Sequence, residues 1–324
     1  MRIFCNFAPD LYKHTFFCFM DNRNTRPLIA HLSIFLACAF WGLMAPLGKD
    51  AMTHGITGID MVTFRVCGAA ILFWVTSFFT RREHVTRRDL MLFPLAGIFG
   101  LVCNQCCYTI GLSITSPINA SIVTTSMPIF AMILAALILK EPITGKKATG
   151  VLMGCSGALI LILTSAAATS DKVGDIRGDL LCLFAQFSFA LYLSLFNPLV
   201  RRYSVFTVNK WMFTWAVAFI LPFSFGHVAA IPWASVPTST WLETAYVVVV
   251  GTYLSYILTM IGQRTLRPTV VSIYNYVQPL VSVTVSVLTG IGAFRWSHGL
   301  AVALVFSGVW LVTKSKSKRD MENL

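Results

Sequence analysis

Apolar stretches long enough to cross a bilayer recur through most of this chain of 324 residues. A bilayer core about 30 Å thick is spanned by about 20 mainly apolar helical residues, and such stretches follow one another from Ala30 to Thr313. Charged residues make up only 12% of the chain, against about 25% in a soluble globular protein. The sequence therefore predicts an all-α integral membrane protein.

Ten of these segments, delimited by charges, glycines and prolines, are predicted to be transmembrane helices. In the first half they lie near residues 30–50, 59–80, 89–110, 117–139 and 147–167. In the second half they lie near residues 178–199, 207–226, 241–262, 268–290 and 298–314. Counted from Met20, eighteen lysines and arginines fall on one side of these helices and four on the other. By the positive-inside rule both termini are predicted to be cytoplasmic. The expected location is the plasma membrane, or the inner membrane if the source is a bacterium.

The net charge of +12 has the same explanation. Lysines and arginines form short clusters between the apolar segments rather than one basic face, so no nucleic-acid partner is expected. Cys103, Cys106 and Cys107 form a C-x-x-C-C run inside an apolar segment, with no histidine nearby. Buried small side chains explain this run better than a metal site does, and neither a metal nor another cofactor is predicted.

The two ends of the chain are interpreted separately. Residues 1–29 form a tail that lacks the small-residue cleavage site of a signal peptide. The polar run that begins at Met20 resembles an ordinary cytoplasmic start, so residues 1–19 are expected to be either a mis-assigned extension or disordered. Residues 315–324 are expected to form a basic cytoplasmic tail.

The second half of the chain repeats the first at a constant offset. Gly111 and Gly262 are 151 positions apart, and the same offset relates many other positions without a gap. Further pairs are Pro117 and Pro268, Pro128 and Pro279, Ile110 and Ile261, Ser121 and Ser272, Ile122 and Ile273, Leu137 and Leu288, Gly157 and Gly308, Ala39 and Ala190, and Trp41 and Tyr192. Prolines and glycines that keep one register over such a length indicate an internal duplication.

The predicted repeats are residues 30–167 and 178–314, joined by a linker at 168–177. Each repeat contains five predicted helices, and this odd number makes the second copy enter the membrane from the opposite side. Inverted repeats of this kind are typical of transporters, with a substrate site near the midplane where the repeats meet. The predicted fold is therefore ten transmembrane helices, arranged as two inverted five-helix repeats around a central cavity.

Several short motifs along the chain resemble those of a known family. They are Trp41-Gly42, Phe64-Arg65, Gly111-Leu112, Ala120-Ser121 with Pro128, Lys140-Glu141-Pro142, Gly150 and Gly157. In this order and spacing, over roughly residues 30–314, they resemble the EamA-type family of the drug/metabolite transporter superfamily. The resemblance implies ten helices, a central cavity and, in many members, export of amino acids or other metabolites.

The second repeat departs from the family pattern at the turn after the ninth predicted helix. Glu141 corresponds at the offset of 151 to Gly292, where the family usually repeats the acidic residue. A role that needs symmetric carboxylates is therefore not expected. Glu141 is predicted to cap a helix end and to pair with Lys140 or Lys146.

Arg65 is the only basic residue well inside an apolar segment, and an arginine there costs about 2.5 to 3.5 kcal/mol on insertion scales. One interpretation is a counter-charge for an anionic substrate group such as a carboxylate. The other is an arginine that snorkels, or bonds to carbonyl groups, near the outer end of its helix. The sequence leaves both interpretations open.

Polar residues near the two helix breaks are predicted to line the cavity. Proline removes a backbone donor and frees a carbonyl one turn earlier, and polar atoms gather before Pro128 and Pro279. The predicted substrate-binding residues are Trp41, Arg65, Asn104, Tyr108, Asn119, Thr124, Tyr253, Tyr274, Asn275 and Gln278. The alternative for each amide or hydroxyl is an interhelical hydrogen bond. Two interpretations are open for Trp41, Tyr192, Tyr253 and Tyr256: they form an aromatic wall of the cavity, or they pack between helices and at the membrane interface.

The predicted function is transport: a carrier that exports amino acids or similarly small polar compounds by alternating access. Within transport, the alternative is a carrier of bulkier drugs, nucleosides or nucleotide sugars, which an aromatic content of 13% also suits. Proton coupling has no evident carrier in the sequence, because no aspartate or glutamate lies in the middle of a predicted helix.

Two other classes are weaker. An enzyme is not predicted, because neither a metal-binding histidine pair nor paired aspartates within the membrane occur. A membrane sensor or partner subunit would call for a soluble domain or a long tail, and the sequence between predicted helices has neither. The expected partners are the small-molecule substrate and bilayer lipid, and a homodimer remains an open alternative.

Overall fold

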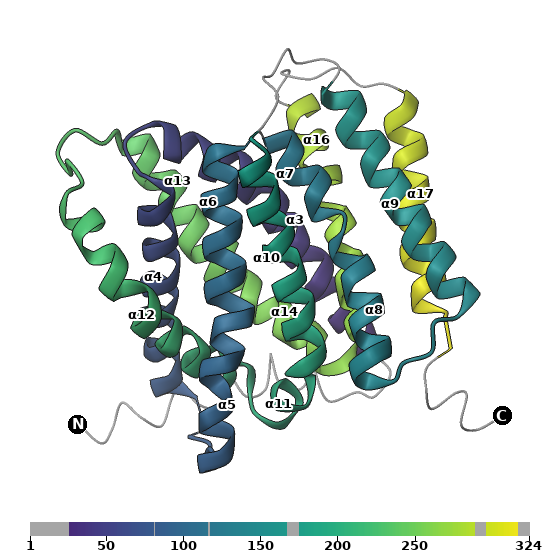
Figure 1. The fold of residues 1–324 in the computed structure, drawn as a ribbon, viewed down its shortest axis with the longest axis horizontal. Coiled ribbons are helices and arrows are strands. Elements are labelled where there is room, and N and C mark those ends of the chain that lie inside the picture. Colours follow the sequence, from purple (N-terminus) through teal and green to yellow (C-terminus); the bar gives the residue numbers. More distant parts are fainter. Residues whose placement is uncertain (1–25, 81, 116, 167–174, 289–295, 317–324) are drawn as a thin grey trace, which may run out of the picture.

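The computed structural model describes residues 26–80, 82–115, 117–166, 175–288 and 296–316. Within these ranges the regular structure is helical throughout, and most helices stand side by side along one common direction (Figure 1). The prediction of an all-α protein is confirmed for this part of the chain. Residues 1–19 and most of the predicted linker lie outside it, so the expectations for them have no structural counterpart.

The helices of the first half follow the predicted segments closely. They are α3 (Arg26–Thr53), α4 (Gly58–Phe79), α5 (Arg87–Gly97), η2 (Ile98–Cys106), α6 (Cys107–Ile114), α7 (Pro117–Thr124), α8 (Met127–Leu139) and α9 (Gly145–Ala166). Local sequence sets the boundary before α4, where the Thr57 side chain accepts from the backbone N–H of Asp60 and the Asp60 carboxylate accepts from that of Thr57. This reciprocal capping box satisfies two backbone donors that a helix start leaves free.

The second half has a similar order of elements. They are α10 (Ile176–Leu195), α11 (Asn197–Arg202), α12 (Val205–Ala229), α13 (Thr238–Val248), η3 (Val249–Leu254), α14 (Ser255–Thr265), α15 (Pro268–Ile273), η4 (Tyr274–Tyr276), α16 (Val277–Leu288) and α17 (Trp296–Thr313). In each half one long helix contains a π-helical stretch, η2 in the first and η3 in the second. A short 3-10 turn, η4, separates α15 from α16.

Seven helical segments of the described chain are long and apolar enough to cross a membrane. They are Pro27–Thr53, Gly58–Phe79, Arg87–Ile114, Ile122–Leu139, Ile176–Leu195, Val205–Ala229 and Thr238–Thr265. Each contains all or most of one of the ten predicted segments. The other three predicted segments, 147–167, 268–290 and 298–314, correspond to α9, to α15, η4 and α16, and to α17. The 3-10 turn η4 interrupts the second of them, and the described part of α17 includes the apolar stretch Gly299–Thr313.

Large apolar side chains face outward over much of the surface. Phe78, Phe79 and Phe223 are 71%, 85% and 85% exposed. Contact with water would be costly for such side chains, whereas contact with lipid hydrocarbon is favourable. Together with the seven apolar spans, this outward-facing apolar surface defines a multi-pass membrane protein.

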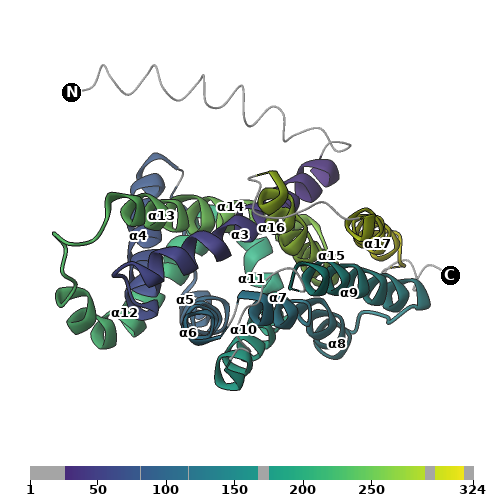
Figure 2. The same cartoon turned by 90° about the horizontal axis from the view of Figure 1, so that it is seen from above.

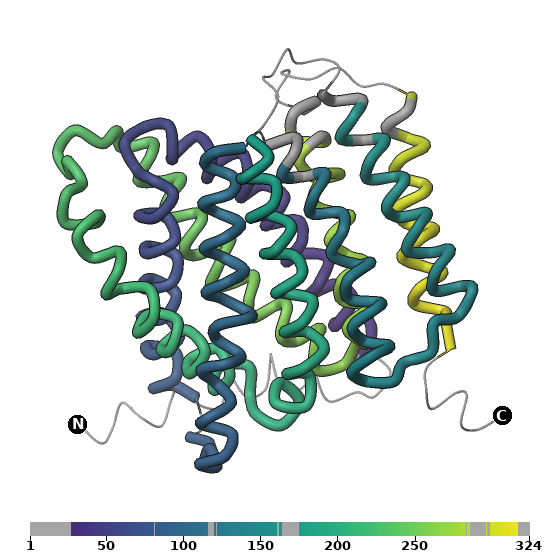
Figure 3. Tube along the Cα trace, in the orientation of Figure 1, coloured from purple at the N-terminus to yellow at the C-terminus, as the bar shows by residue number. Residues whose placement is uncertain are grey.

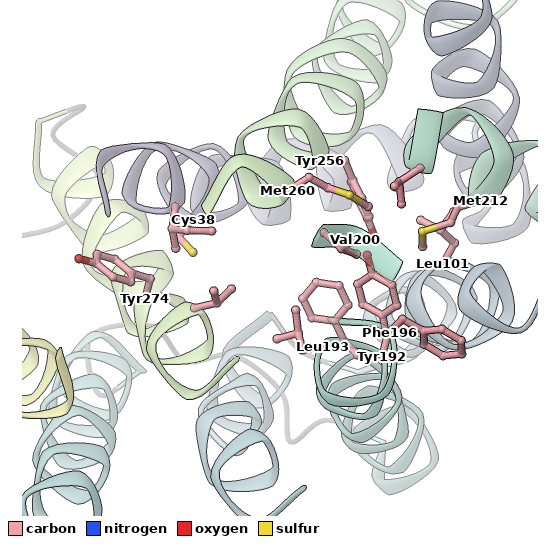
Figure 4. Close-up of a cluster of buried hydrophobic side chains, with 14 of the residues drawn as sticks. Cys38, Leu101, Tyr192, Leu193, Phe196, Val200, Met212, Tyr256, Met260 and Tyr274 are labelled. Carbon is pink, nitrogen blue, oxygen red and sulfur yellow. The ribbon is translucent and has the colours of Figure 1, made fainter. Parts of the chain in front are cut away.

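The interior is packed with aromatic and aliphatic side chains from both halves of the chain. Figure 4 shows Tyr192 of α10, and Phe196 directly after α10, close to Met212 of α12 and Tyr256 of α14. Tyr192 and Phe196 lie with their rings nearly parallel, at an interplanar angle of 23°. This core joins the second half to η2 of the first, which contributes Leu101.

Helix pairs from opposite halves pack together along the molecule. Helix α9 packs along α17 at one edge and α4 along α12 near the other, while α3 contacts α13, α14 and α16 (Figure 2). Gly150 and Gly308 allow the close approach of α9 and α17, because a Cβ atom added at Gly150 would lie 2.8 Å from the Gly308 carbonyl oxygen. Figure 3 traces α3 rising from the lower end of the bundle and α17 descending to the same end.

Candidate central cavity

A polar cavity of about 60 Å³ lies inside the bundle. Because a buried water needs roughly 10–15 Å³ of such space, the cavity has room for a few water molecules or a very small solute. Its walls combine amides, aromatic rings and one cation: Trp41, Met44, Arg65, Asn104, Gln105, Tyr108, Thr124, Gln186, Phe189, Tyr256, Asn275 and Gln278. Among the residues that the structure describes, no aspartate or glutamate belongs to this lining.

The two halves of the chain contribute to this cavity together. Helices α3, α4, η2, α6 and α7 supply the residues up to Thr124, and α10, α14, η4 and α16 supply the others. Gln105 and Tyr256 occupy equivalent positions at the offset of 151, and they touch each other: the Gln105 Nε2 donates to the Tyr256 hydroxyl at 3.0 Å. A contact between equivalent residues is expected where two related halves meet around an axis.

Arg65 is buried at the wall of this cavity, with only 5% of its surface exposed. Its Nε donates to Thr252 Oγ1 and its Nη1 donates to Thr109 Oγ1, each at 3.1 Å. These hydroxyls lie on η3 and α6, so the guanidinium joins the two halves. Arg65 neither snorkels to an exposed helix end nor bonds to backbone carbonyls within the described chain.

The π-helices help to shape the cavity. Helix η2 begins at Ile98 and η3 at Val249, which is the same offset of 151. A π-turn widens the helix and misaligns its carbonyl groups, and such turns are frequent at functional sites. Cavity residues bond to these carbonyls: Trp41 Nε1 donates to the Gly251 oxygen at 3.0 Å, and the Tyr256 hydroxyl donates to the Gly100 oxygen at 3.2 Å.

Both predicted proline breaks correspond to interruptions of a helix. Residues 125–126 form a turn between α7 and α8 just before Pro128, and η4 lies just before Pro279. The Thr124 hydroxyl donates to the Ala120 carbonyl oxygen at 2.8 Å. Asn275 accepts a short hydrogen bond at 2.5 Å from Gln278 Nε2, and both side chains face the cavity. Polar atoms therefore gather where proline weakens the helix.

Seven of the ten residues predicted to bind substrate line this cavity. They are Trp41, Arg65, Asn104, Tyr108, Thr124, Asn275 and Gln278. Two others lie elsewhere: Tyr253 packs its ring against Phe73 at a centroid distance of 4.7 Å, and the Tyr274 hydroxyl bonds to His31 Nδ1 at 2.9 Å. Asn119 belongs to α7, but its side chain lies outside the described part of the structure.

Five lining residues are absent from the predicted set. Met44, Gln105, Gln186, Phe189 and Tyr256 all belong to the cavity wall. Gln105 and Gln186 carried a usable signal, since each is an amide within an apolar segment. Met44 and Phe189 carried none, because apolar side chains are the common lipid-facing or core residues of such helices. Only the packing between helices distinguishes these two cavity residues from lipid-facing or core residues.

Of the four aromatic residues with two open interpretations, Trp41 and Tyr256 line the cavity. Trp41 lies edge-on to Phe189 and to Tyr256, with ring centroids 6.1 Å apart in both pairs. Tyr192 is 1% exposed and belongs to the hydrophobic core rather than to the lining.

Glu141 pairs differently from the prediction. Its Oε2 lies 3.0 Å from the Nζ of Lys147, and neither Lys140 nor Lys146 pairs with it among the described residues. Lys147 is 1% exposed and lies in the first turn of α9, which follows the loop that contains Glu141. The prediction considered only the lysines nearest in sequence, whereas Lys140 adopts a left-handed backbone conformation with φ of 54° that ends α8.

A second ion pair lies at the start of α5. Asp89 accepts hydrogen bonds from Arg202 Nη1 at 2.6 and 2.8 Å and from the Tyr203 hydroxyl at 2.7 Å. The hydrogen bond and charge of Asp89 raise the pKa of the Arg202 guanidinium. The contact joins α5 to the last residue of α11 and to Tyr203 directly after it, again across the two halves. In the described residues no group of three or more histidine, cysteine, aspartate or glutamate side chains is placed to hold a metal ion.

A multi-pass helical protein whose halves enclose a polar cavity beneath a lipid-compatible surface has the architecture of a membrane transporter. The model of the EamA-like transporter family matches residues 28–163 and, a second time, residues 176–314. The chain belongs to this family.

Two of the similar proteins are described as transporters. A Bacillus subtilis protein described as the uncharacterized transporter YetK is 23% identical over 90% of this chain and 88% of the relative. The uncharacterized transporter YyaM, also of Bacillus subtilis, is 22% identical over 93% of this chain and 99% of the relative. A WAT1-related protein of Arabidopsis thaliana is 21% identical over 92% and 87%, respectively.

A solved crystal structure shares the fold. It superposes with a TM-score of 0.68, covering 90% of this chain and 97% of that chain at 19% sequence identity.

Proposed function

We propose that this transporter exports amino acids or similarly small polar compounds by alternating access through the central cavity. The observation that carries the proposal is a polar cavity with one cation, enclosed by both halves of a multi-pass membrane protein. Its volume of about 60 Å³ favours small substrates over bulkier drugs, nucleosides or nucleotide sugars. Opening toward one membrane face is required before a substrate can enter.

The proposed framework for this cycle is ten membrane-spanning helices in two inverted five-helix repeats, residues 30–167 and 178–314. The two matches of the family model support it, as do the offset of 151, the paired π-helices and the paired interruptions before Pro128 and Pro279. Two repeats that each contain an odd number of membrane helices have opposite orientations in the membrane. When the two inverted halves exchange conformations, the cavity opens to the other face.

We further propose that both termini face the cytoplasm, with the protein in the plasma membrane. The supporting observations are the excess of lysine and arginine on one side of the predicted helices and the common end of the bundle at which α3 begins and α17 ends (Figure 3). Protease digestion of the C-terminal tail tests this: cleavage is expected in inside-out vesicles and protection in right-side-out vesicles.

Uptake into inside-out vesicles tests the function. Vesicles from cells with and without the protein are given labelled amino acids, nucleosides and cationic drugs, with and without a protonophore. Faster entry of a small polar compound when the protein is present supports the proposal. Transport restricted to the bulkier compounds, or equal entry in both vesicle preparations, contradicts it.

A further inference from the structure

The charge of the central cavity is not balanced by the protein. Arg65 remains protonated under physiological conditions and has five N–H groups. Two of them donate to the hydroxyls of Thr252 and Thr109, and no carboxylate pairs with Arg65 within the described residues. A buried cation is costly unless an anion compensates it. The remaining N–H groups therefore need an acceptor, and an anion in the cavity can supply one.

The other described cavity residues offer no negative charge to pair with a positive group. They are amides, hydroxyls, aromatic rings and a thioether, and none is acidic. Trp41 uses its indole N–H on the Gly251 carbonyl, and Asn104 uses its Nδ2 on the Ala185 carbonyl at 3.0 Å. The ammonium group of a free amino acid would thus leave water without gaining a carboxylate partner, which is unfavourable.

Gln105 provides a second, independent feature. Tyr256 has a single hydroxyl proton, which it donates to the Gly100 carbonyl, so Gln105 must present its NH2 group to the Tyr256 oxygen. This fixes the orientation of the amide and leaves Gln105 Oε1 buried without a hydrogen-bond partner. The side chain is 1% exposed and lies in the cavity wall. A buried unpartnered acceptor is rare in proteins and calls for a donor.

We propose that the cavity takes a small organic monoanion whose carboxylate binds Arg65 and whose neutral hydroxyl or amide N–H donates to Gln105. This inference rests on the proposed transport function and narrows its substrate class. A 2-hydroxy acid or an N-acylated amino acid has both groups, whereas a free amino acid carries an additional positive charge that no acidic side chain of the described lining compensates. Charge-assisted hydrogen bonds to guanidinium supply the affinity, and Gln105 supplies the preference for a donor.

Four isosteric probes separate these groups. Lactate, alanine, lactamide and alaninamide share one shape and differ in whether they carry a carboxylate and whether they carry an ammonium. Labelled lactate is bound to the purified protein in nanodiscs, and the unlabelled compounds compete with it. Lactate is expected to bind roughly 10- to 100-fold more tightly than lactamide, the range for hydrogen bonds to a charged group, and also more tightly than alanine.

A variant that supplies the missing carboxylate is the sharpest test. Thr109→Asp places a side chain of similar volume where the Thr109 hydroxyl now lies 3.1 Å from Arg65 Nη1. It compensates the cation and is expected to reduce lactate affinity to that of lactamide, while Thr109→Ser keeps the hydroxyl and the affinity. Gln105→Leu, with Arg65 untouched, is expected to remove the preference for lactate over propionate and serves if Thr109→Asp does not fold.

Three results would overturn the inference. The first is that lactate shows no saturable binding, and the second is that lactamide or alanine binds as tightly as lactate. The third is that folded Thr109→Asp keeps the wild-type affinity for lactate. Counterflow of a labelled amino acid by the same preparation distinguishes the two levels of the account. If the amino acid moves while lactate does not bind, the transport function stands and the anion inference fails.

Discussion

The buried ion pair between Glu141 and Lys147 gives a quantitative prediction about stability. Lys147 and Glu141 are 1% and 9% exposed, and the Glu141 oxygen also lies 3.5 Å from the hydroxyl of Thr269. Replacing Lys147 by methionine keeps the apolar stem but leaves the Glu141 charge without its partner. Breaking one side of a buried pair costs about 3–5 kcal/mol, so Lys147→Met is expected to lower the free energy of unfolding by that amount.

The assay is denaturant unfolding of the purified protein in mixed micelles, followed by tryptophan fluorescence. Lys146→Met is the matched control, because Lys146 is the exposed neighbour on the same turn, and a surface substitution changes stability by about 0.5 kcal/mol or less. The double variant Glu141→Gln with Lys147→Met is expected to recover most of the loss, since no charge is then left unpaired. Equal effects of Lys147→Met and Lys146→Met would refute the pairing.

Two further predictions concern the packing between halves. Gly154→Ala is expected to lower the free energy of unfolding by about 1–3 kcal/mol, because the new Cβ would overlap the ring of the fully buried Tyr276. The control in the same thermal-unfolding assay is Gly226→Ala, since nothing lies within 4 Å of a Cβ at that position. Equal effects of the two substitutions would contradict the close packing. Tyr203→Phe removes one donor from the Asp89 carboxylate and is expected to cost about 1.5–3 kcal/mol. An unchanged unfolding midpoint would show that this hydrogen bond does not contribute.

Sequence alone predicted the class of fold and much of the cavity because the underlying signals are local. A buried arginine, amides in apolar segments and prolines in one register are each unusual within a membrane helix, which is how Arg65, Asn104 and Gln278 were selected. The approximate helix boundaries followed from the charges, glycines and prolines between the apolar segments.

What escaped prediction depends on how helices rotate and pack against one another. Tyr253 and Tyr274 look as suitable as Tyr256, yet only Tyr256 points at the cavity, because the direction of each ring is set by the π-turn and the 3-10 turn nearby. Neither irregular turn has a composition that marks it. Likewise, the partner of Glu141 is decided by the fold of the loop between α8 and α9 and not by proximity in sequence.

Counterflow into proteoliposomes with a cavity variant tests the central claim most directly. Gln186 lines the cavity and makes no hydrogen bond to the protein within the described chain, so Gln186→Leu removes a substrate contact without removing a structural one. Phe187→Leu alters the adjacent residue of α10, which is 37% exposed on the outer surface. The account predicts that the wild type and Phe187→Leu exchange a labelled small polar metabolite above the rate of empty liposomes, and that Gln186→Leu is slower by roughly tenfold, as for one lost hydrogen bond. Exchange by Gln186→Leu at the wild-type rate, or no exchange by the wild type, would contradict transport through this cavity.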